Sequence, residues 1–162
     1  MIIRAETSTD FASVRAIVES AFPTPAEADL VDWLRRDGDA VFSLVAIKGN
    51  ALVGHMVLSK IEAPFRALGL GPVAVLPGHQ RTGVGTRMIK EGLSRAGRMG
   101  WEGVFVLGEP AYYRRFGFDA GKAAGFLSPY AGPHLMALAL GTDDLPACSG
   151  DIMYPAAFAV LG

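Results

Sequence analysis

The chain has 162 residues, of which 51% are hydrophobic, and this composition suits one compact domain over residues 1–162 with a substantial core. Its 15 basic and 16 acidic residues give a net charge of -1, so bulk charge favours neither a nucleic-acid nor a membrane partner. A lone cysteine, Cys148, excludes an internal disulfide framework, and no apolar run reaches the length of a membrane span. We therefore expect a cytoplasmic protein.

In chain order, the hydrophobic pattern first predicts a strand, two helices and a run of strands. Apolar residues recur at helical spacing after the capping sequence of residues 7–10, and Pro23 and Pro25 interrupt that spacing before the second helix. The dipeptide Gly49-Asn50 is typical of a hairpin connection between strands. The predicted elements are a strand at 2–5, helices at 11–21 and 26–36, and strands at 43–48, 51–61 and 67–76.

The second half of the chain predicts a helix over residues 84–99, followed by a buried strand at 103–107. This strand should run parallel to strand 67–76, because a helix joins the two and such crossovers are right-handed. A short helix and two late strands complete the order, at residues 109–115, 134–140 and 151–154. The order predicts an α/β (α+β) fold, in which helices flank a mixed, mostly antiparallel sheet with one parallel pair.

Residues 73–85 are suited to hold an anion. Here a strand turns through a glycine-rich loop into a helix N-terminus, where N–H groups without intrahelical partners and the helix dipole favour negative charge. Gly78 and Gly83 are spaced as in the P-loop of nucleoside triphosphatases, but Val84 stands where that motif needs its lysine. A dinucleotide fingerprint could begin at Gly83, but Met88 replaces its third glycine.

The pattern that remains, Gln80-Arg-Thr-Gly-Val-Gly85, resembles the acyl-CoA signature Q/R-x-x-G-x-G/A of the GNAT acetyltransferases. A second segment, Tyr113-Arg-Arg-Phe-Gly-Phe118, resembles the Y-x-x-x-G-F motif of the same family. The run Gly-Glu-Pro-Ala-Tyr-Tyr at 108–113 and the segments 128–132 and 154–158 are similar to its YhbS-type branch. The predicted order of elements also matches the GNAT fold.

This resemblance implies acetyl-CoA as a co-substrate, with its pantetheine arm between the splayed ends of the parallel strands. The backbone of Val73 and Val75 would hold the arm and the acetyl carbonyl, and the Val75 N–H would stabilise an oxyanion. The amides of the glycine loop would hold the pyrophosphate, while Arg87 and Lys90 are either phosphate contacts or a solvated helix face. The implied coenzyme-binding residues are Val73, Val75, Gln80, Arg81, Thr82, Gly83, Val84, Gly85 and Thr86.

Tyr113 stands where the family has its general-acid tyrosine. A phenol with a pKa of about 10 can protonate the departing thiolate, because the pKa of an alkyl thiol is similar. Tyr112 is the competing residue, interpreted as a packed aromatic. Many GNAT enzymes carry a glutamate base on the strand at 68–75, but this strand has no ionisable side chain. The acceptor amine then needs no strong base, or water relays its proton to one of Glu27, Glu62, His79 and Glu109.

Together these features predict an N-acetyltransferase in which a primary amine attacks acetyl-CoA directly in a ternary complex. The acceptor site is expected between residues 23–29, 62–66 and 128–133, with Glu27 and Tyr130 as candidate contacts for a small-molecule amine, an amino acid or a protein amine. One alternative is a non-catalytic acyl-CoA-binding or sensing module. Another is an acyltransferase with a different acyl group or a hydroxyl acceptor.

We expect no metal site, because the three histidines are scattered and lack acidic or thiol neighbours. No nucleic-acid or membrane partner is expected either. The apolar segment 156–161 either packs within the chain or forms a contact in a homodimer.

Overall fold

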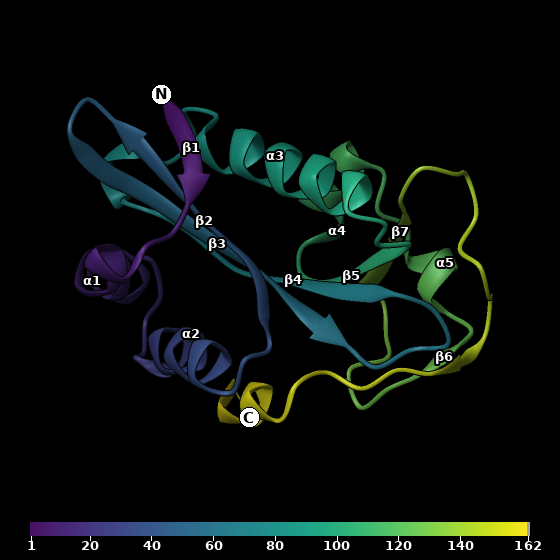
Figure 1. Cartoon of the computed structure of the whole chain (residues 1–162). Coiled ribbons are helices and arrows are strands. Elements are labelled where there is room, and N and C mark those ends of the chain that lie inside the picture. Colours follow the sequence, from purple (N-terminus) through teal and green to yellow (C-terminus); the bar gives the residue numbers. More distant parts are fainter. Residues whose placement is uncertain (162) are drawn as a thin grey trace.

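The computed structural model describes residues 1–161, which form a six-stranded sheet with helices on both faces (Figure 1). The strands lie in the order β1-β2-β3-β4-β5-β7, and all neighbours are antiparallel except β4 and β5, which are parallel. The predicted mixed, mostly antiparallel sheet with one parallel pair is therefore confirmed. The strands are β1 Ile2–Ala5, β2 Ala40–Lys48, β3 Ala51–Ile61, β4 Ala67–Val75, β5 Gly103–Leu107 and β7 Leu135–Ala139.

Helices α1 and α2 cover one face of the sheet, and α3 covers the other (Figure 1). One face of α3 is buried and apolar, with Val84, Met88, Ile89 and Ala96. Met88 packs closely on β3, since a β-carbon added to Gly54 would lie 2.8 Å from the Met88 Cε atom. Gly54 in β3 thus allows α3 to lie close to the sheet. In a dinucleotide fingerprint the third glycine, which Met88 replaces here, would do the same from the helix. The helices are α1 Phe11–Ala21, α2 Ala26–Arg36, α3 Val84–Arg98, α4 Pro110–Tyr113 and α5 Ala120–Ala123, with 3-10 turns η1 Ser8–Asp10, η2 Pro77–His79, η3 Arg114–Phe116 and η4 Ala156–Leu161.

A buried polar cluster ties α2 to the sheet. Arg35 Nη2 donates to Glu6 Oε1 at 2.6 Å, and the Ser43 hydroxyl donates to Glu6 Oε2 at 2.9 Å. His55 is fully buried, and its Nε2 lies 2.8 Å from Ser43 Oγ. Burial, reinforced by the charge of Arg35, lowers the pKa of His55 to about 3, so the ring is neutral. Because the Ser43 hydroxyl donates its hydrogen to Glu6, His55 Nε2 is the donor in its contact with Ser43. This histidine is a packed core residue.

The last third of the chain differs most from its predicted elements. The expected strand at 151–154 is wrong in extent, because β8 covers Gly150–Asp151 and pairs with β6, Phe126–Leu127, in a separate two-stranded sheet. Ile152 and Tyr154 are buried while Met153 is exposed, which explains the strand-like alternation of this extended segment. The following turn, η4, packs on α2, although Leu161 keeps 43% of its surface exposed.

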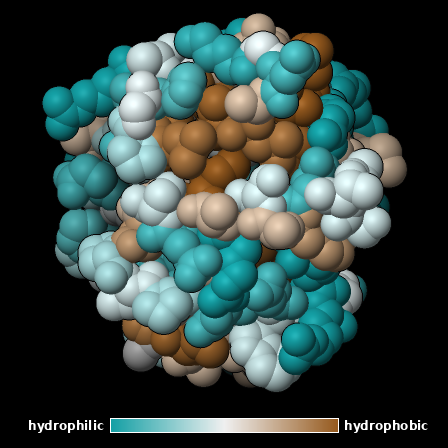
Figure 2. All heavy atoms as spheres, turned by 90° about the vertical axis from the view of Figure 1, so that its left-hand side faces the viewer, coloured by the Kyte–Doolittle hydropathy of each residue, from teal (hydrophilic) through white to brown (hydrophobic). Residues whose placement is uncertain are grey.

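On the side of the molecule shown in Figure 2, hydrophilic residues predominate and hydrophobic residues gather in one larger patch in the upper half. Within residues 1–161, no helix is both long enough and apolar enough to cross a membrane. Exposed large hydrophobic side chains include Ile2, Met99, Leu127 and Met153, which lie on different segments of the chain.

Candidate functional site

The parallel strands β4 and β5 separate toward their C-terminal ends, as predicted. Their pairing ends with Leu70 and Val106, although β4 continues to Val75. The register between β4 and β3 shifts at Gly71 and Pro72, which form a β-bulge and turn this end of β4. The second half of β4 therefore has β3 on one side and open space on the other.

Backbone polar groups of β4 point into this open space. The Leu76 N–H donates to the Val53 carbonyl at 2.9 Å, and this bond makes Val73 and Val75 members of non-hydrogen-bonded pairs with β3. Their N–H and C=O groups therefore point away from β3, toward the side that β5 has left. One of them is in use there, because Gln80 Nε2 donates to the Val75 carbonyl at 3.0 Å.

A polar pocket of about 460 Å³, here named the loop pocket, lies between the end of β4 and the start of α3. The first hydrogen bond of α3 runs from the Arg87 N–H to the Gly83 carbonyl, so the amides of residues 84–86 have no acceptor within the helix. Gly83 has a φ of 90° and Arg81 a φ of 61°, which turn the chain sharply into the helix. Such a terminus binds anions. The lining residues are Val75, His79, Gln80, Arg81, Gly83, Gly85, Thr86, Tyr112 and Arg115.

The structure thus brings six of the nine predicted coenzyme-binding residues to one pocket, and the other three lie differently. Val73 lines the neighbouring cavity described below. The Thr82 hydroxyl donates to the His79 carbonyl, and the Val84 side chain is 2% exposed in the core. Thr82 and Val84 can therefore contribute to the loop mainly through their backbone.

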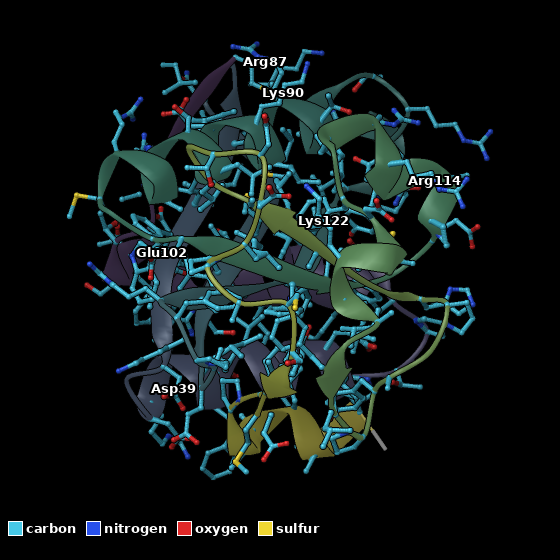
Figure 3. All side chains as sticks on the ribbon, turned by 90° about the vertical axis from the view of Figure 1, so that its right-hand side faces the viewer. Asp39, Arg87, Lys90, Glu102, Arg114 and Lys122 are labelled. Atoms are coloured by element: carbon cyan, nitrogen blue, oxygen red, sulfur yellow. The ribbon has the colours of Figure 1, made fainter. Side chains whose placement is uncertain are left out.

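Arg115 is a loop-pocket residue that the sequence motifs did not single out. Its Cζ lies 4.5 Å from the centre of the Tyr112 ring, which also lines the pocket. The sequence spacing could have identified Arg115, because residues three apart on a helical turn share a face and Tyr112 precedes Arg115 by three. Arg87 and Lys90 instead line a separate hollow on the outer side of α3, where Figure 3 shows them near each other.

A second cavity, of about 270 Å³ and here named the aromatic cavity, begins at the β4 bulge. It brings together Tyr113, Glu27 and Tyr130, which are far apart in the sequence. Its walls come from the connection between α1 and α2, the bulge, the end of β5 with α4, and the last third of the chain. The lining residues are Phe22, Glu27, Leu30, Leu70, Gly71, Pro72, Val73, Leu107, Tyr113, Tyr130, Tyr154, Phe158 and Leu161.

Tyr113 is held by its aromatic neighbours and by Gly108. Its ring packs edge-on against Tyr112 and Phe118, with centroids 5.0 and 5.9 Å away. A β-carbon at Gly108 would overlap the Tyr113 ring, so this glycine, which was not predicted as a site residue, permits the ring position. Burial, with a smaller contribution from Tyr112, raises the pKa of Tyr113 to about 12. The phenol is therefore protonated at neutral pH.

Two polar atoms of residues in the cavity wall have no hydrogen-bond partner among the described residues. One is Glu27 Oε1, on the first turn of α2, and the other is the hydroxyl of Tyr154. Tyr154 is 7% exposed, and burial raises the pKa of its phenol. Tyr154 was not predicted as a site residue, although its segment was noted. Both atoms are buried and belong to residues that line the aromatic cavity.

The expected segment 62–66 and three of the four candidate bases lie outside the aromatic cavity. Because β3 and β4 are antiparallel, residues 62–66 follow β3 beside the beginning of β4, and they line another hollow together with Trp101. Among the four candidate bases, Glu27 is the one that lines the aromatic cavity, whereas His79 lines the loop pocket and Glu109 is exposed before α4. In the described part of the chain, no group of three or more His, Cys, Asp or Glu residues is placed to hold a metal ion.

Known proteins share this fold. Residues 2–121 match the family model described as an acetyltransferase (GNAT) domain. The uncharacterized N-acetyltransferase YhbS of Escherichia coli (strain K12) is 33% identical over 123 residues, which cover 74% of each chain. A crystal structure of Escherichia coli YhbS in complex with CoA has a TM-score of 0.92 at 28% identity and covers 99% of this chain and 93% of that one.

A GNAT acetyltransferase from Brucella melitensis, solved in complex with acetyl-CoA, has a TM-score of 0.80 at 35% identity and covers 97% of both chains. The predicted GNAT fold and the similarity to YhbS are thereby confirmed. The residues matched by the family model include the glycine loop and the Y-x-x-x-G-F segment. This chain is a member of the GNAT acetyltransferase family.

Proposed function

We propose that this protein, as one domain over residues 1–162, transfers the acetyl group of acetyl-CoA to a primary amine by direct attack in a ternary complex. One observation carries the proposal. Val75 lines the loop pocket and Val73 the aromatic cavity, so the two hollows adjoin along the free edge of β4. A coenzyme with its pyrophosphate in the loop pocket would place its thioester at the aromatic cavity, beside Tyr113.

The coenzyme contacts divide between backbone and side chains. The amides of residues 81–86 bind the pyrophosphate, and the guanidinium groups of Arg81 and Arg115 add charge. The free edge of β4 at Val73 and Val75 pairs with the pantetheine arm as an added strand would. Because Gln80 holds the Val75 carbonyl, the Val75 N–H is the group left to stabilise an oxyanion, a contribution of about 3 kcal/mol when well placed.

In the chemical step, the amine nitrogen bonds to the thioester carbonyl carbon, and the C–S bond breaks as the tetrahedral intermediate collapses. Tyr113 donates its phenolic proton to the departing thiolate. The raised pKa of Tyr113 does not disqualify it, because the same apolar surroundings also raise the pKa of the thiol. Cys148 is exposed and lines neither hollow, which favours direct transfer over a covalent intermediate on this thiol.

The acceptor binds opposite the thioester, with Glu27 and Tyr130 among its contacts. Glu27 holds the ammonium group and accepts the proton that must leave before attack, directly or through water. A small-molecule amine and the amine of a peptide or protein both fit this chemistry. The cytoplasmic location favoured by the single cysteine and a homodimeric state belong to the same proposal.

Coenzyme binding can be tested by thermal unfolding with acetyl-CoA, CoA, ATP and NAD at equal excess. A ligand at a hundredfold excess over its dissociation constant stabilises the folded protein by about 2.7 kcal/mol, which gives a clear shift in Tm. Shifts with the two CoA species alone are expected. No shift with either, or a larger shift with ATP or NAD, would overturn the assignment of the loop pocket. Release of free thiol with a panel of amines and acyl-CoAs then tests catalysis and acyl preference.

A further inference from the structure

The acceptor side of the aromatic cavity is apolar on almost every wall. Facing the β4 bulge are two aliphatic side chains, Leu30 and Leu161, and four aromatic rings, those of Phe22, Tyr130, Tyr154 and Phe158. Tyr154 meets the rings of Tyr130 and Phe158 edge-on, with centroids 5.2 and 4.9 Å away. Contacts of this kind hold the rings in fixed positions and leave a preformed apolar surface for a ligand.

Charge in this cavity is of one sign. Glu27 is the ionisable acid in the wall, and the lining residues include no arginine, lysine or histidine. Arg15 on the neighbouring helix α1 is engaged elsewhere, since its guanidinium group bonds to Asp29 at 2.9 Å and to Asp32 at 2.6 Å. A single cation can therefore pair with Glu27, but a carboxylate bound here would find no cationic partner and would face Glu27 as a like charge.

Glu27 Oε1 and the Tyr154 hydroxyl are the unpartnered polar atoms of these walls. An ammonium or amine group has the donors that the carboxylate lacks, and its lone pair, once deprotonated, can accept from a phenol. Because a buried polar group without a partner is unfavourable, a ligand that supplies one hydrogen-bonding nitrogen and is otherwise apolar complements the site.

We propose that the acceptor is a small primary amine with an aromatic or branched apolar body, no carboxylate and no second positive charge. This rests on the proposed acetyl transfer at the same site. Glu27 takes one proton from the ammonium group, and the neutral amine nitrogen then bonds to the acetyl carbon. As the C–S bond breaks, Tyr113 protonates the CoA thiolate, and the second proton of the nitrogen returns through water to the Tyr113 oxygen. The products are an N-substituted acetamide and CoA. The apolar body lies against Tyr130, Tyr154 and Phe158.

A matched pair of amines tests the proposal. 2-Phenylethylamine and phenylalanine differ by one carboxylate, and thiol release from acetyl-CoA is measured with each, and with spermidine as a polycation. We expect kcat/KM for 2-phenylethylamine to exceed that for phenylalanine and spermidine by about 100-fold, because the site cannot pair their extra charges. Equal or faster acetylation of phenylalanine or spermidine would overturn the proposal.

Two variants of α2 separate the role of Glu27 from general damage to the helix. Glu27→Gln should lower kcat/KM for 2-phenylethylamine about tenfold or more and leave the KM of acetyl-CoA unchanged. Asp37→Asn, at the exposed C-terminal end of the same helix, should change neither value. An unchanged kcat/KM in Glu27→Gln would remove Glu27 from acceptor binding.

Thermal shifts distinguish failure of this proposal from failure of the proposed function. With CoA bound, 2-phenylethylamine should raise Tm further, and phenylalanine should not. If CoA raises Tm but 2-phenylethylamine neither raises it nor is acetylated, the acceptor class is wrong while coenzyme binding stands. If neither CoA nor acetyl-CoA raises Tm, the proposed acetyl transfer itself fails.

Discussion

The loop pocket and the aromatic cavity adjoin along β4, yet they are built in opposite ways. Most of the loop pocket comes from one continuous stretch, residues 75–86, and it presents backbone amides and two arginines. The aromatic cavity is assembled from segments between residues 22 and 161 and presents rings around one carboxylate. The first suits a ligand shared by a whole family, and the second suits a ligand particular to this chain.

Substitutions of two adjacent tyrosines test most directly whether the two pockets have different roles. Tyr113 lines the aromatic cavity and Tyr112 the loop pocket. Tyr113→Phe should lower kcat by about 100-fold and leave coenzyme affinity nearly unchanged, because it removes the acid but keeps the ring. Tyr112→Phe should raise the KM of acetyl-CoA a few-fold and preserve kcat. Steady-state kinetics of both variants check this, and equal losses of kcat would contradict it.

Gly108 tests whether the position of the Tyr113 ring matters as much as its hydroxyl. In Gly108→Ala the new methyl group overlaps the ring, so the ring must move and kcat should fall about tenfold. Gly97→Ala on α3 is the control, because a β-carbon there meets no atom within 4 Å. It should stabilise the helix by about 0.5–1 kcal/mol and leave kcat unchanged. A normal kcat in Gly108→Ala would show that the ring position is not critical.

A substitution of Arg115 should weaken coenzyme binding in the loop pocket without changing the aromatic cavity. Arg115→Ala should raise the dissociation constant of CoA about five- to tenfold, since one charge-assisted contact is lost, without affecting acceptor KM. Arg114→Ala removes an equal charge from an exposed neighbour that does not line the loop pocket, and should have little effect. Calorimetry at low and high salt measures this, and the difference between the variants should shrink as salt screens the contact. Equal affinities at low salt would count against Arg115.

The smallest expected effect is an absence of change with pH. A tyrosine with the usual pKa of about 10 is half ionised at pH 10 and would lose half of its activity as an acid. The raised pKa of Tyr113, about 12, keeps it protonated, so kcat at saturating substrates should show no decline from this group between pH 7 and 10. A decline centred near pH 10 that disappears in Tyr113→Phe would show that the phenol is not buried during catalysis.

Sequence and structure agree where a segment specifies its own conformation. The helices at residues 11–21, 26–36 and 84–98 follow from their periodic apolar faces, and the parallel direction of β4 and β5 follows from the helix that joins them. The glycine loop was predictable because its contacts lie within consecutive residues. These features depend on local spacing, which the sequence states directly.

The aromatic cavity was only partly predictable because long-range packing forms it. Glu27 and Tyr130 were identified as candidates, but residues 62–66 were expected beside them and lie at the other end of β4. Short elements such as β6, α5 and η4 are stabilised by distant partners rather than by their own periodicity. Gly108 was overlooked because its importance depends on a ring five residues later that folds back over it.

The position of η4 beside the aromatic cavity affects both how the protein can be tagged and how its cavity can vary. Phe158 and Leu161 line the aromatic cavity, and Figure 1 shows the C-terminus on the opposite side of the molecule from the N-terminus. A purification tag fused after η4 would therefore emerge beside the aromatic cavity, whereas a tag before Met1 would not. Residues 122–161 also lie outside the family match. Substitutions within η4 could thus reshape the wall of the aromatic cavity while the glycine loop stays intact.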